Sequence, residues 1–242
     1  MNTISVIVPT LNEEKLLDRM LRQFTPSLVE RFRIELVVSD GGSVDRTLAI
    51  AAEHAHAVVI NREGIKQTIA MGRNIGARSA KGSVLVFLNA DTLIGDPELF
   101  FTTLIAEIDV PGLAALTCRV EVYPDERRPL DRAFHGFYNW FFAMMNRVGM
   151  GMGRGECHIM KREVFESVLG YADGIAAGED YDMFRRLDQV GRIKFLENVV
   201  VYESPRRYRR YGYLFVTVSW FINFLAVFFL RRSILSEWKP VR

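Results

Sequence analysis

Three clusters of acidic, amide and hydroxyl side chains in the first hundred residues have the chemistry of a site for sugars, phosphates or cations. Thr10 and Glu13 belong to the first cluster, Asp40 to the second, and Asn89 and Asp91 to the third. Their oxygens suit a sugar hydroxyl, a base N–H or a hard divalent cation that also binds phosphate oxygens. If the fold brings the clusters into one crevice, that crevice is a candidate ligand site.

Each cluster directly follows a short aliphatic run that predicts a buried β-strand. The predicted strands cover residues 4–8, 34–38, 58–60 and 84–88. Helical patterns alternate with them at residues 16–24, 47–54 and 65–79, with Asn12 expected to cap the first and Ser43 or Asp45 the second. This alternation predicts an α/β fold with a mostly parallel sheet flanked by helices. Because ligands bind beyond the carboxyl ends of such strands, the clusters are expected to meet there.

The second half of the chain is less regular. Residues 114–122 predict a further strand, residues 124–129 a charged loop, and residues 134–152 form an aromatic and methionine-rich stretch that leads into a glycine-rich segment. With 242 residues, the chain has room for one large α/β domain, or for one domain with an appended segment.

Composition and motifs weigh against several functional classes. The 31 Lys and Arg side chains nearly balance the 29 Asp and Glu, so the net charge of +2 gives no general affinity for nucleic acid. The two cysteines, Cys118 and Cys157, form neither a disulfide framework nor a zinc pattern. The sequence has neither a P-loop nor a G-x-G-x-x-G segment, which argues against an ATPase and a nicotinamide enzyme.

Four segments carry a stronger signal because they occur together and in a fixed order. They are residues 4–13, 37–47, 72–91 and 178–187. In this order they resemble glycosyltransferase family 2, whose nucleotide-sugar-binding fold is called GT-A. The resemblance covers most of residues 4–190 and implies a GT-A-like, Rossmann-like α/β fold.

The resemblance implies a site for a nucleotide-diphosphate sugar donor. Its residues would be Pro9, Thr10, Leu11, Glu13, Asp40, Gly41, Arg73, Asn89, Ala90 and Asp91. Asp40 would hydrogen-bond the base, although a helix-capping role is its alternative. Arg73 would lie near the nucleotide and its phosphates. Asn89, Ala90 and Asp91 stand where the family carries its D-x-D motif, which implies Mg²⁺ or Mn²⁺ at Asp91, with less negative charge because Asn89 replaces the first Asp.

Glu179 and Asp180 match the family's E-D motif, which implies a catalytic role. Asp180 would take the proton of the acceptor hydroxyl, because a hydroxyl is a poor nucleophile until a positioned carboxylate accepts its proton. In-line attack would then invert the anomeric centre. A supporting role is the alternative for Glu179, and both acids also suit the first turn of a helix.

Three arginines are candidate contacts to the phosphates or the acceptor. Arg154 lies in a glycine-rich stretch where related enzymes carry a flexible loop, which could close over the sugar; a plain turn is the alternative. Arg206 and Arg207 could clamp the diphosphate or a phosphorylated acceptor, because a guanidinium group can bind phosphate through two parallel hydrogen bonds. Alternatively, these two arginines form a basic patch beside a membrane.

Residues 213–230 are apolar and uncharged, with arginines on both sides. Such a segment is just long enough to cross a membrane, and it could also lie in the interface or dock on a second subunit. We favour membrane attachment, with residues 1–212 as the catalytic domain and residues 213–242 as a membrane-associating or oligomerising helix. The N-terminus carries no secretory signal, which predicts a location at the cytoplasmic side of the membrane, or in the cytoplasm.

The expected function is therefore an inverting glycosyltransferase that moves a sugar from a nucleotide-diphosphate donor to a hydroxyl acceptor. The apolar helix favours a lipid-linked or envelope-directed acceptor. Two alternatives stay open: a sugar-phosphate nucleotidyltransferase and a non-catalytic membrane-associated scaffold. Against the nucleotidyltransferase, this chain lacks the glycine-rich, basic first loop that is usual in that class. The first strand is followed instead by Pro9, Thr10, Leu11 and Asn12.

Overall fold

The aliphatic runs of the N-terminal half form the strands of a parallel sheet. In the computed structural model, which describes residues 2–61, 66–175, 177–230, 233 and 241, these strands are β1 (Ile4–Thr10), β2 (Ile34–Asp40), β3 (Ala57–Ile60) and β4 (Val84–Leu88). Strand β1 pairs in parallel with both β2 and β4, and β2 pairs in parallel with β3. Val6 and Ile7 point to opposite faces of β1 and are both fully buried, so the sheet is covered on both sides.

Four further strands extend this sheet. They are β5 (Thr92–Ile94), β6 (Leu113–Val122), β7 (Cys157–Lys161) and β8 (Arg192–Glu203), and the strand order is β3-β2-β1-β4-β7-β6-β8-β5. Strand β7 runs antiparallel to β4 and β6, and β5 runs antiparallel to β8, whereas β6 and β8 are parallel. The expected mostly parallel sheet is therefore confirmed, with β5 and β7 as the reversed strands of the described chain.

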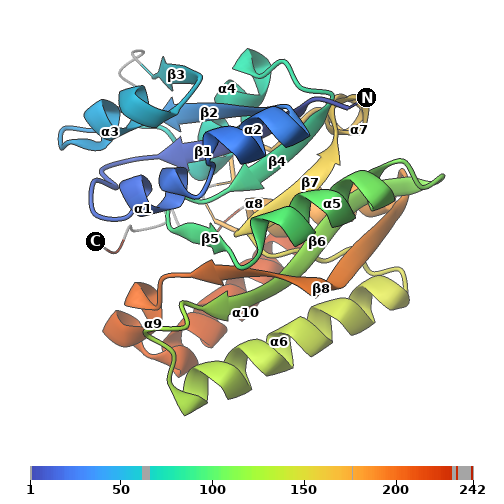
Figure 1. Ribbon diagram of the computed structural model, residues 1–242. Coiled ribbons are helices and arrows are strands. Elements are labelled where there is room, and N and C mark those ends of the chain that lie inside the picture. Colours follow the sequence, from blue (N-terminus) through green and yellow to red (C-terminus); the bar gives the residue numbers. More distant parts are fainter. Residues whose placement is uncertain (1, 62–65, 176, 231–232, 234–240, 242) are drawn as a thin grey trace.

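Helices cover both faces of the sheet (Figure 1). One hydrophobic core joins the sheet to α1 (Leu17–Arg22), α2 (Pro26–Phe32), α3 (Thr47–His54) and α5 (Pro97–Ile108). A second core joins the opposite face to α4 (Ile69–Ser79), α7 (Arg162–Ser167) and α8 (Glu179–Asp188). The second core holds α4 and α8 close to the carboxyl ends of β1 and β4, where the polar clusters lie.

Three more helices pack around the C-terminal half of the sheet. The long helix α6 (Pro129–Arg147) is attached to β6 by Asn139, which accepts a hydrogen bond from the Val120 N–H and donates one to the Val120 carbonyl, both at 3.0 Å. Helices α9 (Arg206–Tyr211) and α10 (Tyr213–Leu230) follow β8. Across the described ranges, no helix combines the length and the apolarity that crossing a bilayer needs. Of the expected C-terminal segment, residues 231–242 lie outside the described residues except Ser233 and Val241.

The helix starts differ from those expected. Asn12 does not cap α1, because that helix starts at Leu17. Instead, Asn12 has a left-handed backbone (φ 51°), which Asn tolerates better than most residues. Its side chain accepts a hydrogen bond from the Val44 N–H at 2.8 Å, which ties the loop after β1 to the loop after β2. Helix α3 begins at Thr47 as expected, but its N-cap residue is Arg46, without a side-chain capping hydrogen bond, rather than Ser43 or Asp45. Asp45 instead accepts a hydrogen bond from the Thr47 N–H at 3.0 Å, just before the helix.

Gly153 allows the loop before β7 to approach α8. A Cβ atom at this position would lie 2.1 Å from the ring of Phe184, and that ring is fully buried and cannot move aside. Gly136, in the middle of α6, has no heavy atom within 4 Å of the corresponding position. The two glycines thus differ in packing, and only Gly153 bears on the placement of α8.

Gly153→Ala is expected to lower the free energy of unfolding by about 1–3 kcal/mol, because the new methyl group overpacks the core at Phe184. The control Gly136→Ala should raise it by up to about 1 kcal/mol, because alanine favours an exposed helix interior. Urea denaturation of both variants measures the difference, and equal midpoints would contradict the packing argument.

Candidate active site

A cavity of about 670 Å³ opens beyond the carboxyl ends of β1 and β4. Most of the residues expected from the sequence line it, namely Pro9, Thr10, Leu11, Glu13, Arg73, Asn89, Ala90, Asp91, Arg154, Glu179, Asp180, Arg206 and Arg207. We call this cavity the cleft. It collects polar residues from segments that are far apart in the sequence.

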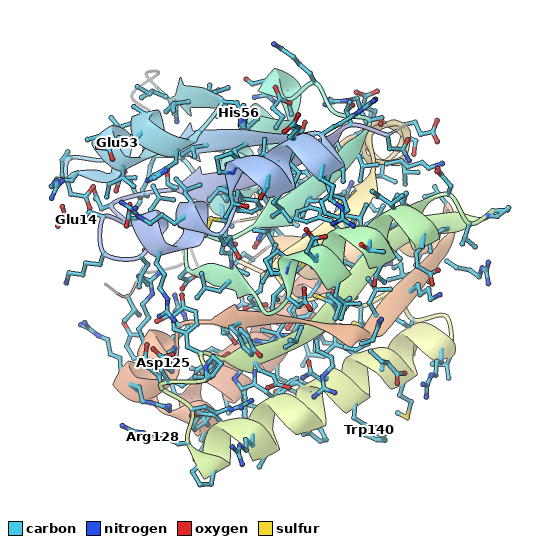
Figure 2. All side chains as sticks on the ribbon, in the orientation of Figure 1. Glu14, Glu53, His56, Asp125, Arg128 and Trp140 are labelled. Atoms are coloured by element: carbon cyan, nitrogen blue, oxygen red, sulfur yellow. The ribbon has the colours of Figure 1, made fainter. Side chains whose placement is uncertain are left out.

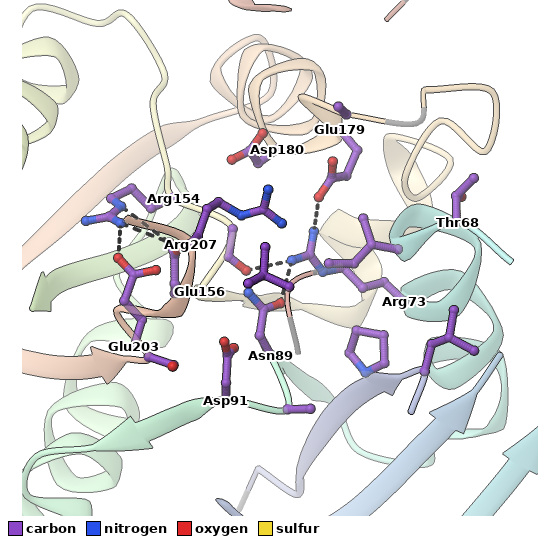
Figure 3. Close-up of a pocket in the computed structure, with 18 of the residues that line it drawn as sticks. Thr68, Arg73, Asn89, Asp91, Arg154, Glu156, Glu179, Asp180, Glu203 and Arg207 are labelled. Carbon is purple, nitrogen blue, oxygen red and sulfur yellow. Dashed lines mark hydrogen bonds and ion pairs between the residues drawn. The ribbon is translucent and has the colours of Figure 1, made fainter. Parts of the chain in front are cut away.

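Arg73 is a central cation of the cleft, and its side chain is fully buried. One guanidinium nitrogen, Nη1, donates to Glu179 Oε1 at 2.8 Å. The other, Nη2, donates to Asn89 Oδ1 at 3.1 Å and to the Gly155 carbonyl at 2.6 Å (Figure 3). A single side chain of α4 therefore connects α8, the end of β4 and the loop before β7.

Asp180 lies next to this ion pair, in the first turn of α8. Its Oδ1 atom accepts a hydrogen bond from the Tyr181 N–H at 3.0 Å. Burial and the neighbouring Glu179 carboxylate raise the pKa of Asp180 to about 8, against the opposing effect of Arg73. A carboxyl group with such a pKa is a stronger base, once ionised, than an ordinary carboxylate.

Asp91 and Glu13 share one arginine. Both terminal nitrogens of Arg206 donate to Glu13 carboxylate oxygens at 2.8 Å, and Nη2 also lies 3.1 Å from Asp91 Oδ2. Burial raises the pKa of Asp91, while Arg206 acts in the opposite direction. Arg206, expected as a phosphate or acceptor contact, thus binds the two carboxylates that the sequence assigns to the donor site.

A second arginine, Arg154, forms a buried cluster with acids on the other side of the cleft. It donates to Glu203 Oε1 at 2.6 Å, and its Nε atom lies 3.3 Å from Glu156 Oε2. His135 Nδ1 lies 3.0 Å from Arg154 Nη1 and acts as the acceptor, because burial and Arg154 lower the pKa of His135 to about 3. Burial and Glu156 raise the pKa of Glu203 well above its ordinary value. Arg154 is therefore held by the body of the protein.

Asp40 and Gly41, both expected at the nucleotide, do not line the cleft. The Asp40 carboxylate is fully buried and accepts four hydrogen bonds. Two come from the N–H groups of Gly42 and Ser43, at 2.9 and 2.7 Å, and two from the hydroxyls of Thr10 and Ser43, at 2.9 and 2.5 Å. Asp40 thus closes the turn after β2 and ties it to the end of β1. Its hydrogen bonds to backbone N–H groups are closer to the capping role considered as the alternative than to a contact with a ligand.

Sequence reasoning did not select Glu156, Glu203, Tyr208 or Trp220, which also line the cleft. Tyr208 donates to Glu203 Oε1 at 2.7 Å, and the Trp220 ring lies 5.6 Å from the Arg154 guanidinium carbon. Glu203 is the last residue of a strand, which is the same signal that selected Asn89 and Asp91. No local pattern distinguishes Trp220 from the other aromatic residues of its helix.

Comparison with known proteins identifies the family. The sequence profile described as Glycosyl transferase family 2 matches residues 5–169. This chain belongs to glycosyl transferase family 2. The expected resemblance is therefore confirmed over most of the chain.

Individual relatives share about a third of their residues with this chain over the matched regions. Validoxylamine A glucosyltransferase of Streptomyces hygroscopicus is 33% identical over 119 residues, which are 48% of this chain and 26% of that protein. Glycosyltransferase AglE of Haloferax volcanii is 32% identical over 205 residues, 81% of this chain and 65% of that protein. The chain thus spans about a quarter of the first relative and less than two thirds of the second.

A solved structure has the same fold as this chain. The mannosyltransferase PcManGT from Pyrobaculum calidifontis, in complex with GDP-Man and Mn²⁺, superposes with a TM-score of 0.67 at 24% identity, covering 84% of this chain and 57% of that chain. The expected GT-A-like α/β fold class is therefore confirmed.

Asp180→Asn is expected to stabilise the protein at alkaline pH. Asn resembles the protonated carboxyl, whereas the wild-type side chain must ionise while it is buried. Because the folded pKa of about 8 lies above the ordinary 3.8, wild-type stability falls relative to the variant as the pH rises from about 4 to about 8, with a limiting slope of about 1.4 kcal/mol per pH unit. Above that pH the difference should stay constant.

Urea unfolding of both proteins between acidic and alkaline pH measures this difference. Asp182→Asn is the matched control, because Asp182 lies on the same helix and pairs with Arg186 outside the cleft. A pH-independent difference between Asp180→Asn and the wild type would contradict the raised pKa.

Proposed function

We propose that this chain is an inverting glycosyltransferase that moves a sugar from a nucleoside-diphosphate donor to a hydroxyl acceptor. The observation that carries the proposal is the placement of Asp180 and Asp91 on opposite sides of one cleft at the strand ends (Figure 3). A proton acceptor on one side and a phosphate-binding side opposite it are what an in-line displacement at a sugar carbon requires. Membership of glycosyl transferase family 2 supports the same reaction class.

The donor would bind along the ends of β1 and β4. Pro9, Thr10 and Leu11, which follow or end β1, and Asn89 and Ala90, which follow β4, line this part of the cleft. Arg206 and Arg207 would face the diphosphate, because guanidinium groups match phosphate oxygens. Figure 3 shows the Arg207 side chain extending into the cleft. Asp40 would act indirectly, by holding the loop that shapes the nucleotide side.

Asp91 suits a Mg²⁺ or Mn²⁺ ion that arrives with the donor. Its carboxylate lines the cleft, and no group of three or more acidic, His or Cys ligands occurs among the residues that the structure describes. One carboxylate is enough for Mg²⁺, which usually takes its remaining ligands from phosphates and water. When bound, the ion would neutralise negative charge that develops on the departing diphosphate. Mn²⁺ in the mannosyltransferase complex supports a divalent cation and does not choose between the two metals.

Asp180 would act as the general base. Its ionised carboxylate would accept the proton of the acceptor hydroxyl while that oxygen bonds to the anomeric carbon. The bond from this carbon to the phosphate oxygen breaks, and its electron pair leaves with the nucleoside diphosphate. Because the acceptor attacks opposite the leaving group, the anomeric configuration inverts. Glu179 would position Asp180 and compensate the charge of Arg73, which it contacts at 2.8 Å.

The acceptor would be lipid-linked or envelope-directed. Trp220 and Asn223 of α10 line the cleft, so the C-terminal apolar segment contributes directly to the site. We therefore propose that this segment, expected from the sequence to be a separate membrane-associating or oligomerising helix, also forms part of the acceptor wall. The cytoplasmic location expected from the sequence stays a prediction.

Donor binding is expected to raise the melting temperature in a metal-dependent way. A panel of UDP-, GDP-, dTDP- and CMP-sugars with and without Mn²⁺ or Mg²⁺ should show one nucleotide class that raises Tm by about 5 °C or more near saturation. Asp91→Asn should remove the metal-dependent part of this shift. Asp109→Asn, at an exposed side chain far from the cleft, is the control.

A shift that is identical with and without metal, or unchanged in Asp91→Asn, would place the metal elsewhere. A flat panel with well-folded protein would contradict the proposed donor class.

Asp180→Asn is expected to lower the transfer rate by about 10²–10⁴-fold while the donor-induced thermal shift is retained. Release of nucleoside diphosphate from the donor selected by the panel measures the rate, with monosaccharides and lipid-linked sugars that carry a free hydroxyl as trial acceptors. Proton NMR of the product should show an anomeric configuration opposite to that of the donor. Near-normal turnover of Asp180→Asn, set against the control Asp182→Asn, would refute the base assignment.

A further inference from the structure

Helix α10 has two different faces. On one face, Val216, Asn223, Ala226 and Val227 are buried against the protein. On the other, six large apolar side chains are between 37% and 79% exposed, namely Leu214, Phe215, Val218, Phe221, Ile222 and Leu225. Their spacing places them along one side of the helix, and we call them the α10 stripe.

The α10 stripe is continuous and contains no charged residue. Scattered apolar side chains are normal on a protein surface, but a contiguous apolar patch marks a contact with another molecule or with a membrane. The buried face shows that α10 is held in place by the protein, since Trp220 packs on Phe134 and Tyr138 of α6 at ring distances of 6.0 and 5.5 Å. The stripe is therefore presented on a fixed helix.

Helix α6, which packs beside α10, also exposes aromatic side chains. Phe137 and Trp140 are each more than half exposed, and their ring centres lie 6.1 Å apart. Figure 2 shows Trp140 on the outer side of α6, away from the sheet. Tryptophan is typical of surfaces that lie at the level of lipid headgroups, where its ring is apolar and its N–H is hydrated.

Positive charge gathers at the start of α10. Residues 204–230 contain four arginines and no acidic residue. Arg209 binds Asp131 at the start of α6 at 2.6 Å, which joins this region to the exposed Arg128 and Arg132. Within the described part of the chain, Arg128, Arg132 and Arg210 are exposed and make no ion pair. An apolar stripe beside unpaired arginines has the pattern of an interfacial helix that binds anionic lipid.

We propose that the α10 stripe, with Arg128, Arg132 and Arg210, binds the surface of an anionic membrane. The helix would lie in the plane of the interface, with the α10 stripe among the acyl chains and the arginines at the headgroups. A second copy of this chain fits less well, because a two-fold contact through this face would bring Arg128, Arg132 and Arg210 of one copy toward the same arginines of the other. The proposal does not depend on the proposed transfer reaction.

Membrane binding through this face would bring the bilayer next to the cleft. The opposite face of the same helix carries Trp220 and Asn223, which line the cleft. One helix would then separate the lipid surface from the site by its own width. This arrangement explains why an apolar helix is both exposed and part of the cleft wall.

Co-sedimentation with vesicles tests the surface. The wild-type chain is expected to bind vesicles of phosphatidylcholine with phosphatidylglycerol, and to bind phosphatidylcholine alone more weakly. High salt should weaken the binding, because screening reduces the attraction of the arginines. Phe215→Ser/Phe221→Ser should lower the partition coefficient at least about tenfold, since two exposed rings no longer enter the acyl region.

Charge and matched controls separate the two contributions. Arg128→Gln/Arg132→Gln/Arg210→Gln should reduce binding to the phosphatidylglycerol vesicles at least about tenfold and abolish the preference for them. Val44→Ser/Val190→Ser and Arg46→Gln/Arg78→Gln change exposed residues elsewhere and should bind like the wild type. Circular dichroism and the nucleotide-sugar thermal shift should be the same in all variants.

The proposal is overturned if the wild type does not sediment with anionic vesicles, or if the stripe variant binds them as well as the wild type. Sedimentation velocity supplies a further test. A wild-type dimer that becomes monomeric in Phe215→Ser/Phe221→Ser would show that a second copy covers the α10 stripe. Vesicle binding without any nucleotide-sugar shift would support the surface and contradict the proposed function.

Discussion

The burial of the Arg73 guanidinium is the constraint on which the site depends. A cation without exposure to water needs acidic and carbonyl partners, and removing them would leave an uncompensated buried charge. Glu179, Asn89 and the Gly155 carbonyl meet this need at 2.6 to 3.1 Å. These partners come from α8, from the end of β4 and from the loop before β7. Satisfying one side chain therefore fixes three segments relative to α4.

The acids of the cleft differ in how closely an arginine neutralises them, and their proton affinities differ as a result. Glu13 forms two hydrogen bonds with Arg206, and Glu203 is bonded to Arg154. Asp180 accepts a bond from a backbone N–H, and burial beside Glu179 raises its pKa to about 8. A group whose two protonation states are close in free energy near neutral pH is suited to proton transfer. This chemistry fits the proposed role of Asp180 as the general base.

The C-terminal helices connect this chemistry to the outer surface. Arg206 and Tyr208 of α9 reach Glu13 and Glu203 inside the cleft, and Trp220 of α10 reaches Arg154. The same helix α10 exposes the α10 stripe on its other side. Trp220 and the α10 stripe therefore belong to one helix, so a contact at the surface and a ligand in the cleft would both act on α10.

The sequence by itself determined the parallel strands of the N-terminal half and the polar residues that follow β1 and β4, because hydrophobic periodicity and strand ends are local properties of the chain. It also singled out Arg73, Asp91 and Asp180, through their motifs. The tertiary structure decided the rest. It directed the Asp40 carboxylate toward the N–H groups of the loop that follows β2. It also paired Arg206 with Glu13, 193 residues away in the sequence. It also buried Glu203 beside Arg154. Such pairings depend on which surfaces meet when the sheet and helices pack, and no local pattern records that.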